Sequence, residues 1–400
     1  MSIDYYKQRY VPNNYAQYSS ENSAFVSSTD ITNELGQRID KTEKALYQKI
    51  KDLDRQETSC TKHSIYVGSC GIALLYLHKY MKQNDSDALA RGKRIITDAN
   101  EKFKNRGISF LQGDAGPLAL GFLFNAYTSG STSPTDYSRR LCTLADKNAN
   151  SASELLTGRA GYLYALLFVQ KHFKNIISDE LLRKQISIIL HAGVQRAEIT
   201  PCEAPLVYEW CDNNYLGAAH GVAGILYILL CCSHLLTPTE KNNLIQPTIE
   251  WLLSQRFPSG NFKPDPDTNQ DNLVQWCHGA PGFVHLFTLA SEVFKSQKYL
   301  EVALQCGEIV WERGLLSKGY SICHGVSGNA YAFLELYKYT KSVKHLHRAA
   351  CFADWCTYYP RNEYMKPDHP FSLFEGLAGL VYFLNDIRKP TMSCFPAYGL

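Results

Sequence analysis

A short glycine element recurs along the chain and constrains its fold more than any other feature. Gly-x-x-Gly followed by an apolar run occurs seven times in the 400 residues, and its first glycines are Gly68, Gly113, Gly158, Gly221, Gly279, Gly325 and Gly376. Consecutive copies lie 45 to 63 residues apart, a period that suits two helices and two loops per repeat. A glycine at the start of a helix indicates a tight turn in which neighbouring backbones come close.

Two kinds of helix are predicted in each repeat. The runs after the glycines, such as residues 224–232 (GILYILLCC), are apolar on every side, which is typical of a buried helix. The segments between them keep amphipathic spacing, as Leu300, Ala303, Leu304 and Gly307 do. Seven such pairs predict an all-α fold, the α/α toroid, in which a ring of outer helices wraps a ring of inner ones. We expect residues 1–30 to be an N-terminal tail near the barrel mouth and residues 31–400 to form a single seven-repeat domain.

Composition and termini exclude several classes of protein. The 41 basic and 38 acidic residues are interspersed, so nucleic acid is not an expected partner. The N-terminus has no apolar leader, the longest apolar stretch is too short to span a bilayer, and Ser2 removes the glycine that N-myristoylation needs. Thirteen cysteines, an odd number, fit reduced thiols in a long chain without a secretory signal. We therefore predict a cytoplasmic protein with no transmembrane segment.

The residues just before the glycines are expected to meet. If every inner helix begins in the same way, all of the loops before them face one end of the barrel. The mouth then collects His220, Cys277, His278, Cys323, His324 and Glu375. The helix N-termini add a positive dipole end there, which favours anions and thiolates.

The dipeptide Cys-His occurs in two successive repeats, as Cys277-His278 and Cys323-His324. Thiolates and imidazoles match zinc in ligand softness. Four side chains would close a structural site, whereas three would leave the open position of a catalytic site. Because neighbouring side chains diverge, three ligands are sterically easier than four, and spacing alone does not say which histidine stays free. Buried cysteines and histidines without a metal are the alternative.

Several motifs together resemble a known family. They include WCHGAPG at residues 276–282, CHGVSGNAYAFL at 323–334, PFSLFEGLAG at 370–379, RYVPNNYAQY at 9–18 and FPAYGL at 395–400. This pattern resembles the eukaryotic LanC-like (lanthionine synthetase C-like) proteins over nearly the whole chain. The resemblance implies the double-layered α/α barrel of the lantibiotic cyclases, in agreement with the repeats.

The resemblance also assigns residues to the metal and to catalysis. It implies one zinc ion per chain, held by Cys277, Cys323 and His324. His278 then lies beside the metal without binding it, as a candidate proton donor. His220 matches the family's active-site histidine, although a core histidine at a helix start is the alternative.

Glutathione is the co-substrate that the family implies. Its two carboxylates need cations, and the resemblance supplies Arg9 and Lys318, with Asp368 available to accept from the glutathione ammonium. The family's Arg-Thr-Pro-Asp run reads Met365-Lys366-Pro367-Asp368 here. Either Lys366 takes over the contact of the missing arginine, or this chain binds glutathione more weakly.

The predicted function is zinc-dependent addition of glutathione to dehydroalanine and dehydrobutyrine residues in peptides or proteins, with small electrophiles as further substrates. The metal would deprotonate the thiol, and a positioned acid must protonate the α-carbon after attack on the β-carbon. We expect His220 to be that acid, with His278 as its substitute.

Three other functions are compatible with parts of this pattern. A glycoside hydrolase could recruit Asp114, Glu154 and Glu375, but has no use for two cysteines in register. The main alternative is a non-catalytic module that binds zinc and glutathione and acts through protein partners, signalling proteins among them. Lanthionine cyclisation is the third, disfavoured because the chain implies no lantibiotic precursor. Glu154 lies where bacterial cyclases place an active-site Asp, and an acid that caps a helix start explains it equally well.

Overall fold

The computed structural model describes residues 9–21, 23–55, 63–102, 106–131, 133, 135–147, 151–360 and 367–400. These residues form two compact units. Unit 1 comprises the described residues of Met1–Thr61, Ser259–Asn261 and Gln270–Gly399. Unit 2 comprises those of Lys62–Pro258 and Phe262–Asn269, with Leu400.

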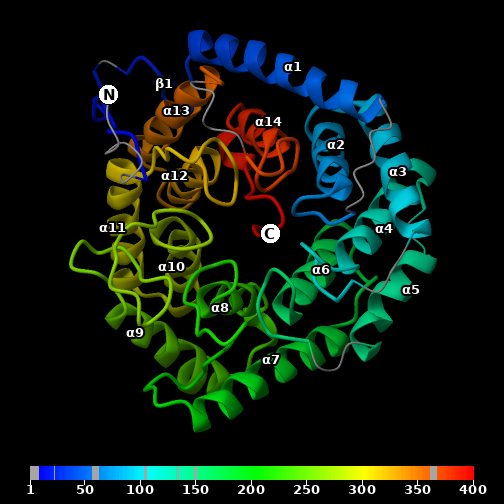
Figure 1. Cartoon of the computed structure of the whole chain (residues 1–400), viewed down its shortest axis with the longest axis vertical. Helices are drawn as coiled ribbons and strands as arrows, with labels where there is room; N and C mark the ends of the chain where they lie inside the picture. The colour runs from blue at the N-terminus through cyan, green and yellow to red at the C-terminus, as the bar shows by residue number, and fades with distance from the viewer. Residues whose placement is uncertain are drawn as a thin grey trace. The chain divides into compact units, whose positions relative to one another are not determined.

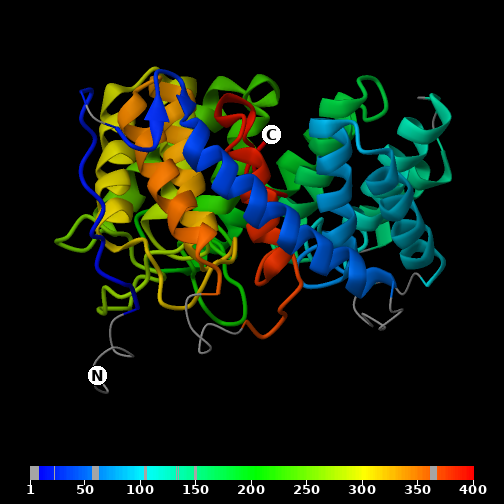
Figure 2. The same cartoon turned by 90° about the horizontal axis from the view of Figure 1, so that it is seen from above.

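Unit 1 is built from helix pairs that form two layers (Figure 1). One layer contains α10 (Ala280–Phe294), α12 (Val326–Thr340) and α14 (Leu377–Asp386), and the other contains α11 (Gln297–Arg313), α13 (Val343–Thr357) and α1 (Asn33–Arg55). The first helix of the chain therefore packs against the last one, and Figure 2 shows α1 crossing α14. A short hairpin of β1 (Val26–Ser27) and β2 (Asp30–Ile31) packs on α13, and the 3-10 turn η5 (Pro390–Met392) lies on α12.

Unit 2 continues the same alternation of buried and amphipathic helices. Its buried helices are α2 (Ser69–Gln83), α4 (Ala115–Ser129), α6 (Arg159–His172) and α8 (Val222–Cys231), each packed on the next. They alternate with α3 (Ser86–Glu101), α5 (Asp136–Thr143), α7 (Asp179–Ile199) and α9 (Gln246–Ser254). Short turns of 3-10 helix, η2 (Leu144–Lys147) and η3 (Ser233–Leu235), and a π-helical turn, η4 (Glu240–Ile245), join these elements.

The predicted role of the glycines is confirmed: a buried helix begins at each of the seven copies. The second glycine of the element lies in the first turn, against the loop that precedes the helix. A Cβ atom on Gly224 would come within 1.9 Å of the Ala218 carbonyl oxygen, and one on Gly328 within 1.8 Å of the Ile322 carbonyl oxygen. Such distances leave room for no side chain, so the close approach itself requires glycine.

A backbone ladder sets the register between successive loops. At three steps the residue two positions before the first glycine donates its N–H to the carbonyl of the equivalent residue in the next repeat. In unit 1 the bonds run from Cys277 to Cys323 (3.3 Å) and from Cys323 to Phe374 (2.9 Å), and in unit 2 from Tyr66 to Leu111 (3.0 Å). Side chains at equivalent positions are therefore brought side by side.

The N-terminal tail is tied to unit 1 by hydrogen bonds. Val11 N donates to Leu315 O (2.6 Å), Ser317 N donates to Arg9 O (3.1 Å), and Asn13 Nδ2 donates to the Trp311 carbonyl (2.6 Å). Figure 2 shows this tail running alongside α11. The tail thus contacts the loop that leads from α11 to Cys323, and its relation to a barrel mouth stays a prediction.

Two expectations about the whole chain can be compared with the structure. The twelve cysteines in the described ranges are all free thiols. Of the helices described, none has both the length and the apolar character that crossing a bilayer requires.

Candidate functional site

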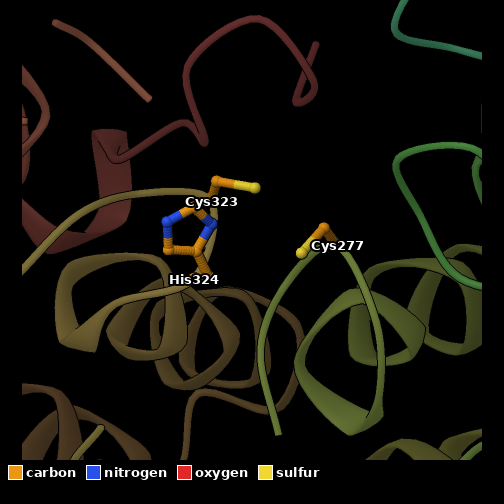
Figure 3. Close-up of side chains that lie close together, drawn as sticks. All are labelled: Cys277, Cys323 and His324. Atoms are coloured by element: carbon orange, nitrogen blue, oxygen red, sulfur yellow. The ribbon is translucent and has the colours of Figure 1, made fainter. Parts of the chain in front are cut away.

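The loops before α10 and α12 bring three potential metal ligands together. The ligand atoms of Cys277, Cys323 and His324 all lie within 4.8 Å of one another. Figure 3 shows the two sulfur atoms and the imidazole converging from two separate loops. The cysteines are almost fully buried, at 6% and 3% exposure. The ladder bond between the two cysteine backbones brings these loops together.

The three donors fit a zinc ion in chemistry and in spacing. Ligands about 2.2 Å from a tetrahedral metal lie roughly 3.6 Å apart, so small side-chain adjustments would close the group on an ion. The pKa of the Cys277 thiol is held well below its usual range, because hydrogen bonds with Cys323 and then His324 outweigh the opposing effect of burial. Within the described residues His278 is not part of this group of three donors.

Residues beside the ligands hold the Cys277 loop. Gln275 Nε2 donates to the Cys277 sulfur at 3.2 Å, and the backbones of Gln275 and His278 exchange two hydrogen bonds of 3.2 Å. The Trp276 ring stacks on Phe395 with centroids 5.0 Å apart. Phe395, in the C-terminal segment, therefore packs against the loop that carries Cys277.

Asn261 clamps the other side of this loop. Its amide donates to the Leu273 carbonyl (2.9 Å), and its side-chain oxygen accepts from Ala280 N (2.8 Å) in the first turn of α10. Between them Gly279 adopts φ +109°, a conformation that favours glycine. The loop that carries Cys277 is thus fixed at both ends by one side chain.

Asp271 in turn fixes Asn261. It accepts from Asn261 Nδ2 (2.7 Å), from Ser259 Oγ (2.6 Å) and from both terminal nitrogens of Arg313 (2.9 Å each). Burial by itself would raise the pKa of Asp271, but these donors outweigh it and the pKa is lowered. An ionised Asp271 therefore stabilises the folded loop.

A pocket opens beside His324 within unit 1. Its walls include Lys318, Asp368 and Glu375, together with Ser321 and Tyr359. Lys318 and Asp368, two of the predicted glutathione contacts, are exposed and line this pocket. A small molecule that entered it would meet one cation and two carboxylates beside His324.

Of the other two predicted glutathione contacts, Arg9 lies within the described residues and Lys366 does not. Arg9 offers its carbonyl to Ser317, next to Lys318 in the chain, and its own side chain is exposed. Lys366, like Met365, lies outside the described residues. The exchange of the family's arginine for Met365, with Lys366 beside it, therefore stays a prediction from the sequence.

Unit 2 contains His220, the histidine predicted to act in catalysis, and its ring lies against a buried carboxylate. The Nδ1 atom of His220 lies 3.0 Å from Glu154 Oε2. Glu154, with 2% of its side chain exposed, also accepts from the backbone N–H groups of Leu156 (2.6 Å) and Thr157 (2.5 Å) and from the Thr157 hydroxyl. Because Glu154 accepts from these three other donors, we assign the proton of its bond with His220 to Nδ1.

Glu154 accepts from the loop before α6 and not from the first turn of the helix, whose N-cap Gly158 has no side-chain cap. It also bonds the imidazole of His220, whose side chain is 16% exposed. Asp114, another of the three acids considered, is fully buried and accepts from Arg106 N (2.8 Å) and Nε (2.9 Å), a structural arrangement.

Sequence reasoning missed Gln275, Asn261 and Trp210, whose indole stacks on the His220 ring. Gln275 precedes a Cys-His pair, and this place beside a ligand was a signal for it. Asn261 and Trp210 lie outside the repeated element, so the repeats gave no signal for them.

The comparisons with known proteins agree with this architecture. The sequence matches the family model described as "Lanthionine synthetase C-like protein" over residues 59–400. It is 41% identical over 341 residues to the Danio rerio protein named "Glutathione S-transferase LANCL1", covering 83% of this chain and 84% of that protein. It is 35% identical over 358 residues to "LanC-like protein GCL1" of Arabidopsis thaliana, covering 84% and 81%.

A solved structure shows the fold. "Nisin cyclase" superposes with a TM-score of 0.64 at 15% sequence identity, covering 86% of this chain and 94% of that one. The predicted fold class, an all-α chain of the α/α toroid type, is confirmed. With a family model that matches most of the sequence and two relatives above 30% identity, the chain belongs to the lanthionine synthetase C-like family.

Proposed function

We propose that this chain is a zinc-dependent glutathione transferase that adds the thiol of glutathione to dehydroalanine and dehydrobutyrine residues in peptides or proteins, and to small electrophiles. The observation that carries the proposal is the group Cys277, Cys323 and His324, with a charged pocket beside it. A relative named as a glutathione S-transferase supports the choice of thiol. The free thiols support a reducing compartment, the cytoplasm.

The three ligands would hold one zinc ion, and each has a defined origin. Cys277 comes from the loop before α10, and Cys323 and His324 come from the loop before α12. Bound there, zinc would supply a Lewis acid at which a thiol with a pKa of about 8.5 loses its proton at neutral pH. His324 belongs to both the ligand group and the pocket wall, which supports binding of the thiol substrate in that pocket.

The pocket residues would orient glutathione by charge. Lys318 suits a glutathione carboxylate, and Asp368 suits its ammonium group. Arg9 and Lys366 stay predicted cations for the second carboxylate. This polarity favours a zwitterionic peptide over a neutral thiol.

The addition needs a proton at the α-carbon, which we assign to His220. The glutathione sulfur forms a bond to the β-carbon of the dehydroamino acid as the carbon–carbon double bond opens. The α-carbon takes its proton from the imidazolium, the thiol proton passes to solvent, and solvent reprotonates the ring, so that the net change is S–H added across the double bond. Glu154 would hold His220 in the tautomer whose Nε2 exchanges the proton. His278, beside the ligands, is the substitute acid.

Mass spectrometry of glutathione addition to a dehydroalanine peptide tests the proposal. Wild type should form adducts, Cys323→Ala should form none above the uncatalysed rate, and His220→Ala should be slowed at least tenfold with its zinc content unchanged. Lys318→Ala should raise KM for glutathione, and Cys142→Ala, a half-buried cysteine elsewhere, should behave as wild type. A folded, zinc-loaded wild type that forms no more adduct than glutathione alone would exclude catalysis and favour the non-catalytic binding module.

A further inference from the structure

The chain that leads to Trp210 is anchored on α7. Val207 N donates to the Gly193 carbonyl at 3.1 Å, and Glu209 forms an ion pair with Arg196. Both partners lie on the same helix of unit 2. Trp210 is thus delivered by a segment fixed to a regular element.

A tight turn follows immediately and fixes Trp210 itself. The backbones of Trp210 and Asn213 exchange hydrogen bonds of 2.9 and 3.1 Å. The two residues between them, Cys211 and Asp212, both have positive φ angles, +48° and +60°. Turns of this kind normally use Asn-Gly, and other residues are uncommon in this region. Unfavourable backbone of this kind persists where its surroundings hold it, often at functional sites.

This turn places the indole of Trp210 flat on the imidazole of His220. The ring centroids are 3.8 Å apart and the planes differ by 12°. The Glu154 carboxylate meets the same imidazole at its edge, through Nδ1. One contact fixes the plane of the ring, and the other fixes its rotation within that plane.

We propose that Trp210 is a positioning residue for His220, holding the imidazole plane so that the proton is exchanged at Nε2. The proposal rests on the proposed function, in which His220 protonates the α-carbon. The electron-rich indole face also attracts a cation, so it stabilises the imidazolium from which that proton leaves. Glu154 alone leaves the ring free to tilt about the Nδ1 hydrogen bond, and the indole removes that freedom.

Steady-state kinetics of glutathione addition tests the catalytic side. Trp210→Leu should lower kcat at least tenfold and leave KM for glutathione within twofold of wild type, because Trp210 does not line the pocket proposed for glutathione. Trp210→Phe keeps an aromatic face and should restore kcat to within threefold of wild type. Trp251→Leu, a half-buried tryptophan of α9, is the matched control and should stay within twofold. A folded Trp210→Leu variant with kcat within twofold of wild type would overturn the proposal.

Nuclear magnetic resonance of the wild type, with ¹⁵N-labelled histidine, gives a measurement that needs no tryptophan variant. The ring current of the indole should shift the Cε1–H and Cδ2–H resonances of His220 upfield, and its nitrogen shifts should report a proton on Nδ1. His220→Gln identifies these signals. Resonances at the positions of exposed histidines would overturn the proposal even where Trp210→Leu fails to fold. A wild type that shows the upfield shift but adds no glutathione would instead refute the proposed function and leave the positioning supported.

Discussion

Units 1 and 2 repeat the same loop at the start of a buried helix and carry different side chains in it. In unit 1 the two residues before the first glycine are Cys277-His278 and Cys323-His324. In unit 2 the corresponding residues before α8 are Ala219 and His220. The soft donors of unit 1 converge on one another, whereas His220 is bound by a carboxylate from the loop before α6.

The difference shows that the backbone sets the positions and the side chains set the chemistry. Close approach of glycine to the preceding loop recurs in both units, and so does the ladder between loops. One unit uses this frame for donors that suit a soft cation, and the other uses it for an imidazole bonded to a carboxylate. Damage to either site should therefore leave the other intact.

The largest expected effect comes from removal of a thiolate from unit 1. Cys277→Ala leaves two protein donors, and zinc affinity should fall on the order of 10³-fold, measured by competition with a chromophoric chelator. The histidine resonances of His220 should not move. Cys142→Ala is the control, and retention of one tightly bound zinc ion by Cys277→Ala would contradict the ligand assignment.

The converse change in unit 2 is Glu154→Gln. The amide can hold the wrong tautomer of His220, as in other carboxylate–histidine pairs, so kcat/KM for glutathione addition should fall roughly 10²- to 10³-fold. Zinc content should remain at one ion per chain by mass spectrometry of the native protein. Glu203→Gln, an exposed residue of the same unit, controls for the change of charge. Equal activities for Glu154→Gln and Glu203→Gln would contradict the role assigned to Glu154 in unit 2.

A smaller effect is expected at the residue beside the ligand. Gln275→Ala removes the N–H that Cys277 accepts at 3.2 Å and should lower zinc affinity about tenfold, the lower end for groups that support a metal ligand. The rate of zinc loss to a chelator measures it. Gln297→Ala, exposed at the start of α11, provides the control. An unchanged rate would assign Gln275 to loop packing alone.

The smallest effect is one of stability, at Asp271. Because the pKa of Asp271 is lowered in the folded protein, its ionised form stabilises the fold above the unfolded value of about 3.9, and that stability is lost as pH falls through the lower folded pKa. Asp271→Asn should lower the free energy of unfolding at pH 7 by about 1–2 kcal/mol, measured in urea. The difference from wild type should shrink towards pH 3. Asp267→Asn, exposed four residues earlier in the chain, should show neither change, and a pH-independent difference would refute the ionic explanation.

Much of the fold could be predicted because the repeated Gly-x-x-Gly element has one physical cause, the close approach of each helix start to the preceding loop. Each glycine marks a helix start, and the close approach at Gly224 and Gly328 explains why no other residue serves. The pairing of Cys277 with Cys323 followed from equivalent positions in neighbouring repeats. The hydrogen bond from Cys277 N to Cys323 O joins these two equivalent positions.

The remaining parts of the site depend on contacts that no repeat encodes. Glu154 and His220 are 66 residues apart, and the loop position of the acid differs from that of the histidine. Trp210 reaches His220 by way of a turn built from Cys211 and Asp212, residues that do not predict such a turn. Single interactions of this kind carry no periodic signal, so only the folded chain reveals them.

The pairing of α1 with α14 has a consequence for how the protein is made. At about 5–20 residues per second, synthesis of the 400 residues takes roughly 20–80 s, and α14 emerges near its end. Until α14 has been synthesised, the apolar face of α1 lacks this helix to pack against. Three residues of α1, Leu35, Ile39 and Ile50, are fully buried in the finished fold. The sequence of unit 2 leaves the ribosome much earlier. A nascent chain is therefore expected to need protection at its N-terminal helix, and one that stops short of α14 should expose that helix to chaperones and proteases.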